Sequence, residues 1–583
     1  MYSVGTNEMW SVHLIWVVFF VNFHGGFAGK PHVIMIIADD LGWNDVGFHG
    51  SNQIPTPNID ALAYNGAILN RFYTQHTCTP SRSALMTGNY PIRTGMQGFP
   101  IKGGENRSLP ENMPTLPQRM KELGYKTHLV GKWHLGHGHR NSTPNMKGFD
   151  SFYGYWNGLI SYVDYKLQFG SIDGDHGVDL HDNLSPAEDF QGKYATHLFT
   201  QKTVSIIEQH PENEPLFLIL SHLAGHTGNE ENGNSLTAAD LDETNRKFAY
   251  ISDKRRRNYT DIVFELDKSV GQVVQTLSAK KMLQNSVIIY LHDNGAQTSG
   301  GLHENFGSNW PLRGQKFSLF EGAVRGTCVV YAPSIPEGYI NNELMHITDW
   351  LPTLYALGGG DLSRLGQIDG VNQWPSIQSN VPSNRTDVLV NIDEVLQYSS
   401  YISYGGQYKL VNGSYPGGQY DGYTGETGRG SEVPVYNPEN VLQSTTNVLI
   451  NNLKANRLNS STVTRIRSQL DISACRPFNY ITKWDCKNLC LFDLFKDPCE
   501  TSNIIMFRPD LGRELSENMH YYWGQLVPQA LNPVDEKANP KLCDGHYFNW
   551  LEEDGCKSHG SGGGVKQFTK LTLGMYFVLA RLL

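Results

Sequence analysis

Three short, unbroken apolar runs constrain the fold of this chain more than any other feature of its sequence. They are H-V-I-M-I-I-A (32–38), L-F-L-I-L-S (216–221) and S-V-I-I-Y-L (286–291). Apolar runs of this length are typical of strands that are buried on both faces, as in parallel sheets. Helical periodicity lies between them, at 115–124 and at 260–283. Strands that alternate with helices predict an α/β fold with a largely parallel sheet.

The length of the chain predicts more than one domain. Its 583 residues exceed what a single hydrophobic core usually serves. We expect a large catalytic domain at 30–386, built on a mixed sheet flanked by helices. A smaller C-terminal α+β domain, with a short antiparallel sheet and a cluster of disulfides, is expected at 387–557.

Both ends of the chain carry segments that resemble targeting signals. An apolar core at 12–23 is followed by small residues, which is typical of a cleaved secretory signal over 1–28, with an uncleaved anchor as the alternative. At the other end, 558–583 combines small residues, a polar spacer and an apolar tail. That pattern fits a lipid-anchor signal, and a frayed tail is the alternative. The chain is therefore expected in the secretory pathway, as a secreted, lysosomal or lipid-anchored protein attached to the cell-surface membrane.

Glycosylation motifs support export independently. Seven N-x-S/T motifs occur, a density that is unusual unless some of them are used. They begin at Asn106, Asn141, Asn183, Asn258, Asn384, Asn412 and Asn459.

The cysteines divide unevenly along the chain. Six of the eight crowd into the last fifth, and in an exported protein this predicts three disulfides whose pairing stays open. Cys328 lies in the strand-like T-C-V-V-Y-A, which predicts an inert core thiol. The six are Cys475, Cys486, Cys490, Cys499, Cys543 and Cys556.

Acidic residues end two of the three apolar runs. Asp39 and Asp40 follow the first run, and Asp293 and Asn294 follow the third, in L-H-D-N-G. Since the carboxyl ends of parallel strands meet at one edge of a sheet, four oxygen-bearing side chains are expected to converge there. Such oxygens are the ligands that calcium or magnesium prefers. One Asp pair is more often a cap or a turn, but two pairs at strand ends favour a metal site.

Cationic and imidazole side chains follow other predicted strands and loops. Taken singly, a lysine is usually solvated and a histidine is often a hydrogen-bonded core residue. Collected around one metal ion, they would bind and neutralise an oxyanion. Because the formal net charge is −10, nucleic acid is excluded as the main partner, and an anionic substrate has to be met by such a local pocket. The residues are Arg82, Lys132, His134, His222, His226, Arg313 and Lys316.

Cys78 opens the segment C-T-P-S-R, where a polar turn leads into an apolar run. A cysteine at a helix start lies in the positive field of unpaired backbone N–H groups. Pro80 suits the first helical position. A half-buried thiol or a disulfide partner is the ordinary interpretation of one cysteine, but the surrounding set favours a nucleophile.

Four motifs in order carry a resemblance to a known family. They are I-A-D-D-L-G-W-N-D, C-T-P-S-R, G-K-W-H-L-G and W-P-L-R-G-Q-K, in a stretch that runs from about Pro31 to Glu394. This pattern resembles the type I sulfatases, nearest to their arylsulfatase B (N-acetylgalactosamine-4-sulfatase) group. The resemblance implies an alkaline-phosphatase-like fold and hydrolysis of sulfate esters, with a sulfated sugar or a small-molecule sulfate as substrate.

The resemblance also implies two cofactors. Cys78 would be converted by the formylglycine-generating enzyme to formylglycine, an aldehyde that is hydrated to a diol. One calcium ion would be held by five residues. These metal ligands are Asp39, Asp40, Cys78, Asp293 and Asn294.

Other residues take catalytic and substrate-binding roles by the same resemblance. Lys132 and Lys316 would bind the sulfate oxygens, and Arg82 and His134 would hold and activate the diol. His226 would face the leaving oxygen beside Lys316, and the choice of acid between these two stays open.

Three alternatives remain at this point. One is a sulfatase specialised for small plant-derived sulfated glucosides. A second is a phosphate or phosphonate ester hydrolase of the same superfold, although such enzymes commonly carry threonine or serine as nucleophile and leave C-x-P-S-R unexplained. The third is a catalytically inactive binding protein, which should have lost part of the ligand set.

Overall fold

The fold is described by a computed structural model. The predicted signal segment, 1–28, and the predicted tail, 558–583, lie outside the residues that it describes. Among the described residues, no helix combines the length and the apolar character that crossing a bilayer requires. The described residues are 29–170, 174–229, 235–301, 303–335, 337–475, 486 and 488–556.

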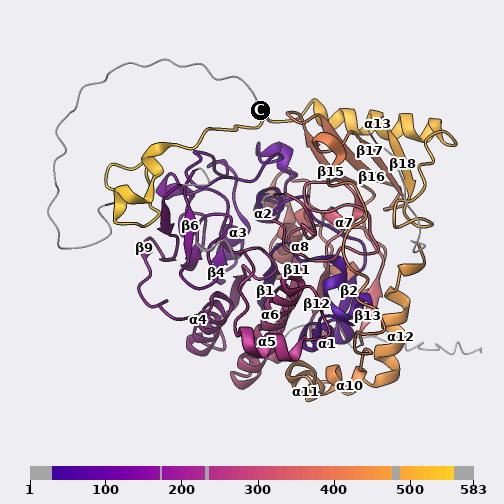
Figure 1. The fold of residues 1–583 in the computed structure, drawn as a ribbon, viewed down its shortest axis with the longest axis horizontal. Coiled ribbons are helices and arrows are strands. Elements are labelled where there is room, and N and C mark those ends of the chain that lie inside the picture. The colour runs from indigo at the N-terminus through magenta and orange to yellow at the C-terminus, as the bar shows by residue number, and fades with distance from the viewer. Residues whose placement is uncertain are drawn as a thin grey trace, which may run out of the picture.

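Ten strands form the large sheet, whose centre is parallel (Figure 1). The three apolar runs are its three central strands, and every residue in them is buried. The strand order is β13 (Tyr339–Asn341), β2 (Ala67–Leu69), β12 (Cys328–Tyr331), β11 (Ser286–His292), β1 (His32–Ala38), β10 (Leu216–Ser221), β4 (Lys126–Lys132), β5 (Ser151–Tyr155), β8 (His181–Asp182) and β9 (Ser185–Pro186). β1 runs parallel to both of its neighbours, whereas β12 and β8 pair antiparallel with theirs. The mixed sheet is as predicted.

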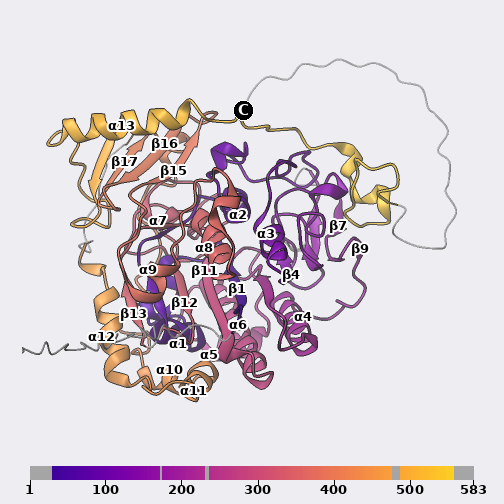
Figure 2. The same cartoon turned by 180° about the vertical axis from the view of Figure 1, so that it is seen from behind.

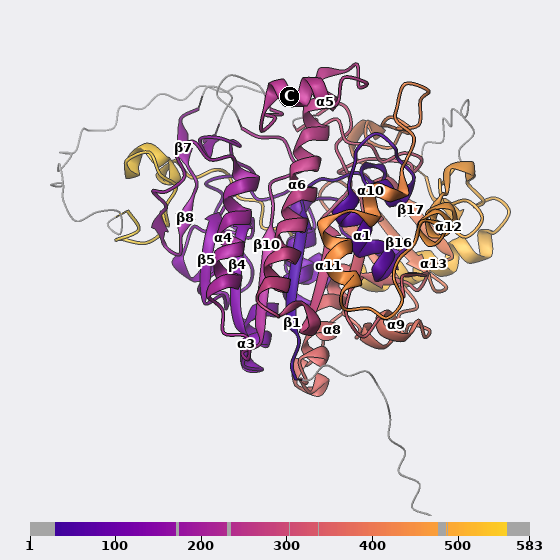
Figure 3. The same cartoon turned by 90° about the horizontal axis from the view of Figure 1, so that it is seen from below.

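Helices cover both faces of this sheet (Figure 3). Successive residues of β1 enter opposite cores: Ile34 and Ile36 point into one, Val33 and Met35 into the other. This alternation explains why the strand carries no polar residue after His32. The first core is closed by α1 (Pro57–Asn65), α4 (Ala195–Gln209) and α6 (Lys254–Ala279). The second is closed by α2 (Cys78–Thr87), α3 (Leu116–Glu122), α8 (Trp350–Leu357) and α9 (Trp374–Ser379).

The long helix α6 begins earlier and ends earlier than the apolar pattern at 260–283 predicts. Its first turn is the basic run K-R-R-R, and the Asp253 side chain caps it by accepting from the Arg255 backbone N–H. Leu283 belongs to a separate 3-10 turn. Apolar periodicity marks the buried middle of a helix and misses a polar, capped first turn.

A second, smaller sheet is fully antiparallel, as predicted for the C-terminal part. Helix α13 packs across it through Leu511, Leu515 and Met519. The sheet and its helix lie together beside the large sheet (Figures 1 and 2). Its elements are β15 (Val388–Asp393), β16 (Tyr398–Ser403), β17 (Tyr408–Asn412), β18 (Cys490–Asp493) and α13 (Pro509–Trp523).

Two C-terminal segments pack against the N-terminal part of the chain instead. Between β17 and β18, the helices α10 (Pro438–Leu442), α11 (Thr445–Asn451) and α12 (Ser460–Leu470) join the core that contains α6. After α13 the chain crosses to β7 (His176–Val178), which pairs with β6 (Lys166–Gln168) (Figure 2). The domain boundary placed at 387 therefore stays a prediction.

Three disulfides join the six C-terminal cysteines, as predicted. The bridges are Cys475–Cys499, Cys486–Cys490 and Cys543–Cys556. Cys78 and Cys328 are buried free thiols. Burial raises the pKa of the Cys328 thiol well above its ordinary value, so this cysteine behaves as a core residue.

Candidate active site

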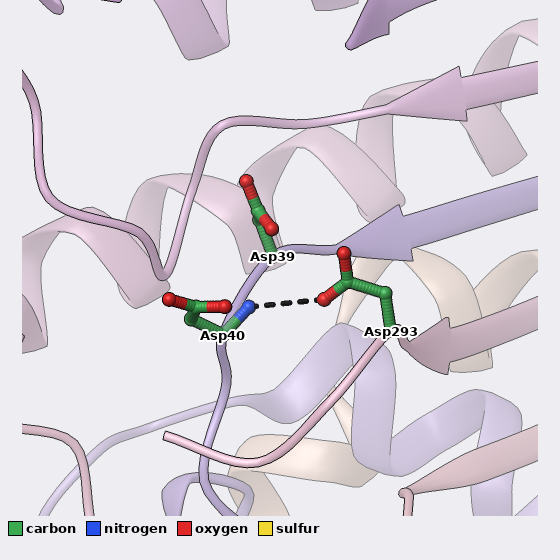
Figure 4. Close-up of side chains that lie close together, drawn as sticks. All are labelled: Asp39, Asp40 and Asp293. Atoms are coloured by element: carbon green, nitrogen blue, oxygen red, sulfur yellow. Dashed lines mark hydrogen bonds between the residues drawn. The ribbon is translucent and has the colours of Figure 1, made fainter. Parts of the chain in front are cut away.

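Three carboxylates meet where β1 and β11 end (Figure 4). The two strands are parallel neighbours with Ala38 opposite His292, so the residues that follow them emerge side by side. Asp39, Asp40 and Asp293 are each about 99–100% buried and offer oxygens that all lie within 4.8 Å of one another. The Asp40 backbone N–H donates to Asp293 Oδ1 at 3.2 Å, which ties the two strand ends together. The predicted convergence of these residues is present.

Asn294 completes this acidic cluster. Its Nδ2 donates to Asp40 Oδ1 at 2.6 Å, while its Oδ1 is buried and finds no hydrogen-bond donor among the described residues. Asp39 Oδ1 is buried and lacks a hydrogen bond in the same way. Burial first, and then the Asp39 charge, raises the pKa of Asp293 to about 6. A hard divalent cation would satisfy these oxygens and relieve the repulsion between them, so the donor set fits calcium or magnesium.

Three cationic side chains surround the carboxylates. Lys132 Nζ donates to Asp39 Oδ2 at 2.6 Å, and Lys316 Nζ donates to Asp40 Oδ2. Arg82 donates to Asp293 Oδ2 through Nε and Nη2, at 3.1 and 2.8 Å. All three are at most 3% exposed, so their charges act with little screening by water.

Cys78 begins helix α2, and Arg82 follows one turn later on the same helix. Pro80 is the third helical residue rather than the first, which the helix tolerates because the first-turn N–H groups have no intrahelical partner. Ser81 Oγ donates to the Asp293 carbonyl, which fastens this turn to the acidic cluster. Burial raises the pKa of the Cys78 thiol, although the charges of Lys132 and Lys316 lower it in part. An unmodified Cys78 is therefore a neutral thiol, a weak nucleophile.

His134 follows β4 in a left-handed backbone conformation, with φ of 59°. Its Nε2 lies 2.9 Å from the Ile101 carbonyl, which can only accept, so Nε2 carries the proton. Nδ1 is consequently a buried acceptor, and it has no hydrogen-bond partner among the described residues. Gly158 packs against the ring so closely that a Cβ built there would lie 2.7 Å from it.

His226 follows β10 and lies beside Lys316. Its Nδ1 lies 2.8 Å from the Thr227 carbonyl, so that nitrogen holds the proton. Its Nε2 lies 3.3 Å from Lys316 Nζ and 3.4 Å from Asp40 Oδ2. Burial, reinforced by the charge of Lys316, lowers the pKa of His226 to about 3. In Lys316 burial has the same sense, but the negative charge of Asp40 outweighs it and raises the pKa above its ordinary value.

Two of the predicted cationic or imidazole residues lie elsewhere. His222 is buried beneath α6, with Nε2 3.0 Å from Ser269 Oγ. Arg313 stacks on the Phe320 ring at 3.9 Å and donates to the Asp421 carbonyl. Both are structural, and their two sequence segments contribute only His226 and Lys316, respectively, to the site.

The site opens into a cavity of about 660 Å³. Cys78, His134, His226 and Lys316 form its polar end. Apolar side chains form much of the rest, with Phe99 and Phe317 stacked at a ring distance of 5.6 Å. The apolar lining consists of Phe99, Pro100, Ile101, Leu159, Leu167, Phe317 and Val534. No motif in the sequence marked these residues, because they come from loops, from the short strand β6 and from the C-terminal segment.

Comparison with known proteins gives consistent matches. The Sulfatase family matches residues 31–360. Arylsulfatase J of Mus musculus is 33% identical over 541 residues, which cover 91% of this chain and 82% of that protein. N-acetylgalactosamine-6-sulfatase of Homo sapiens is 28% identical over 372 residues, or 60% of this chain and 66% of that protein.

Two solved structures share the fold. Ps i-CgsB, solved in complex with k-i-k-neocarrahexaose, superposes with a TM-score of 0.65 at 24% identity and covers 88% of this chain and 97% of its own. The PsFucS1 sulfatase from Pseudoalteromonas sp. superposes with a TM-score of 0.58 at 22% identity, covering 87% and 92%. At these identities the comparison concerns the fold alone.

Proposed function

Because this chain belongs to the sulfatase family and is thereby a sulfuric ester hydrolase, we propose that its reaction depends on formylglycine at Cys78 and on one calcium ion. The observation that carries the proposal is the meeting of a buried cysteine with three carboxylates and three cations at the end of one cavity. A thiol kept neutral by burial is a poor nucleophile, which favours a chemically converted Cys78.

The charges of the site support both ligands together. Three carboxylates, Asp39, Asp40 and Asp293, face three cations, Lys132, Lys316 and Arg82, so the site is close to neutral when empty. A divalent cation would make the site positive, and a sulfate ester, which carries one negative charge, would neutralise part of that charge on binding. Asp39, Asp40, Asp293 and Asn294, with the converted Cys78, would hold the calcium ion, which would acidify the attacking hydroxyl and polarise the sulfuryl oxygens.

Formylglycine at position 78, once hydrated, would supply two hydroxyl groups on one carbon, one for attack on sulfur and one for the release of sulfate. His134 Nδ1 is the acceptor that takes the proton from this second hydroxyl. Arg82, fixed by Asp293 and by Ser221 Oγ at 2.6 Å, orients residue 78 on its helix. The Ile101 carbonyl keeps the His134 proton on Nε2, and Asp293 fixes the orientation of the Arg82 guanidinium.

Lys132 and Lys316 would bind the sulfuryl oxygens once the substrate draws them from Asp39 and Asp40. Lys316 and His226 lie together on the side where the alcohol departs, and we assign the transferable proton to Lys316. Because the pair is buried, water is excluded from the developing charge, which strengthens each contact.

We also propose export and glycosylation. Segment 1–28 would act as the secretory signal, and 558–583 would direct attachment of a lipid anchor. Among the seven acceptor motifs, Asn106, Asn141, Asn384 and Asn459 are exposed and are the expected glycan sites. Asn258 lies within α6 and donates to the Leu236 carbonyl, so it is a poor acceptor.

The test is hydrolysis of a panel of sulfate esters and matched phosphate esters by the full-length protein expressed through a secretory pathway. We expect turnover of sulfate esters, loss of that turnover in Cys78→Ala, and retention of it in Cys328→Ala, which removes the other free thiol. Turnover by Cys78→Ala would contradict the proposed mechanism. A preference for the phosphate esters would favour the phosphohydrolase alternative.

A further inference from the structure

One imidazole in the cavity has no place in the chemistry described above. His303 lines the same cavity as Cys78, His226 and Lys316. Its ring centroid lies 5.4 Å from that of His226, with the two planes tilted by 47°. The ring is close to the reacting groups, yet among the described residues none donates a hydrogen bond to it or accepts one from it.

The backbone that carries His303 is fixed to the site. Asn305, two residues later, donates through Nδ2 to the Asp40 carbonyl and to the Gly225 carbonyl, both at 2.8 Å. Asp40 belongs to the acidic cluster and Gly225 precedes His226. The position of His303 next to His226 is therefore built into the loop between β11 and α7 (Glu321–Val324).

An imidazole without a protein partner in a cavity is available to a ligand. Neutral imidazole offers one donor and one acceptor, which is the pattern that a hydroxyl group complements. The apolar walls of the cavity, including the stacked Phe99 and Phe317, leave few other polar side chains for such a group. Among the lining residues, Lys102 is the one cation outside the polar end of the cavity. The cavity therefore lacks the basic lining that a polysulfated chain requires.

We propose that His303 is a substrate-contacting residue, which binds a hydroxyl group next to the ester oxygen of the leaving alcohol. This inference rests on the proposed function, because it takes the leaving oxygen to lie at His226 and Lys316. A hydroxyl on the neighbouring carbon then faces His303, while the carbon skeleton packs against the apolar wall. The preferred substrate is accordingly a singly sulfated polyol, such as a sugar, with a free hydroxyl beside the sulfate.

A matched pair of substrates isolates this contact. Cyclohexyl sulfate and trans-2-hydroxycyclohexyl sulfate differ by one hydroxyl and have leaving groups of similar basicity. We expect His303→Ala to lower kcat/KM for the hydroxyl compound roughly 5- to 20-fold and to leave cyclohexyl sulfate within about 2-fold. His303→Asn, which keeps a donor and an acceptor, should recover part of the preference. His520→Ala, at an exposed position on α13, should change neither value.

Binding gives a second readout that does not need turnover. In the Cys78→Ala background, His303→Ala should raise the dissociation constant of the hydroxyl compound by a similar factor without changing that of the parent compound. Equal effects on both compounds, no effect on either, or no binding of either would overturn the assignment of His303. If the wild type hydrolyses sulfate esters and any of these results is found, the proposed function is unaffected. Absence of all sulfate ester hydrolysis, with an unmodified thiol at Cys78, would refute the proposed function itself.

Discussion

Lys316 Nζ lies 3.3 Å from His226 Nε2, and the protons of this pair can be assigned. Since the Thr227 carbonyl faces His226 Nδ1, the ring proton is held there and Nε2 is left as an acceptor. The transferable proton next to the leaving oxygen therefore belongs to the ammonium group of Lys316. This geometry favours Lys316 as the acid, the choice that the sequence left open.

Replacing Lys316 should hurt poor leaving groups most. We expect Lys316→Ala to lower kcat on cyclohexyl sulfate by about 10²–10⁴-fold, because an alkoxide cannot leave without a proton. The loss on 4-nitrophenyl sulfate should be at least about 10-fold smaller, since its phenolate leaves unaided. Lys496→Ala, at a side chain that is 82% exposed, is the matched control. Equal losses on the two substrates would assign Lys316 to sulfate binding alone.

Gly158 should control the position of the His134 ring. A methyl group at this position would lie 2.7 Å from the ring, so the imidazole has to move. We expect Gly158→Ala to lower kcat on the order of 10- to 100-fold with a small change in melting temperature, because displacement of a catalytic group costs rate more than stability. Gly422→Ala, where no atom lies within 4 Å of the added Cβ, should retain wild-type kcat. Unchanged kcat in Gly158→Ala would remove His134 from the proton transfer.

Chelation tests the proposed calcium site. Exhaustive treatment with a chelator should abolish hydrolysis and lower the melting temperature, since an ion bound only by the folded state stabilises it by about 2.7 kcal/mol at 100 times its dissociation constant. Calcium should restore both. Asp293→Asn keeps the shape of the side chain but removes one charge, so its melting temperature should no longer respond to calcium. Asp554→Asn, at a side chain that is 60% exposed, should respond like the wild type. A chelated wild type with full activity would contradict the calcium assignment.

Asp267 links pH to stability far from the site. It lies on α6 and accepts from the backbone N–H groups of Asn58 and Ile59, which are in the first turn of α1. Burial raises the pKa of Asp267 from 3.8 to about 7. The folded state therefore holds this proton more tightly than the unfolded state, so the contribution of Asp267 to stability is complete below about pH 4 and declines as the pH rises through about 7.

Asp267→Asn has no such titration and provides the comparison. Between about pH 5 and pH 8, the unfolding free energy of the wild type should fall relative to that of Asp267→Asn by on the order of 2 kcal/mol. Other acidic groups titrate alike in both proteins and cancel in the difference. A constant difference between the two proteins across this range would show that Asp267 is ionised throughout.

The centre of the fold and the convergence of the acidic cluster could be predicted from sequence because they follow from strand endings. Apolar runs without alternation identified β1 and β11, and the residues just after parallel neighbours have to emerge together. The strand ends alone were enough to predict that Asp39, Asp40 and Asp293 lie together. Residues of C-T-P-S-R and G-K-W-H joined them through the resemblance of their motifs.

The cavity wall could not be predicted in this way. His303 lies in an irregular loop, where no period connects sequence position to spatial position. Phe317 follows Lys316 with a backbone φ of 76°, a conformation that sequence rules reserve for glycine. Val534 reaches the cavity only because the chain after α13 crosses the molecule. Likewise, the buried Lys409 pairs with Glu321 at 3.0 Å and Glu500 at 2.9 Å, and these three are distant in sequence.

Peptide mass spectrometry across Cys78 distinguishes a converted residue from an intact thiol. The protein should be isolated from a secretory host that contains the formylglycine-generating enzyme, and the peptide with C-T-P-S-R should be compared with the same peptide from a host that lacks it. We expect the first peptide to have lost its sulfur atom, to carry an aldehyde that reacts with a hydrazine probe, and to come from the active fraction. A fully active protein whose Cys78 peptide still carries a free thiol would contradict it.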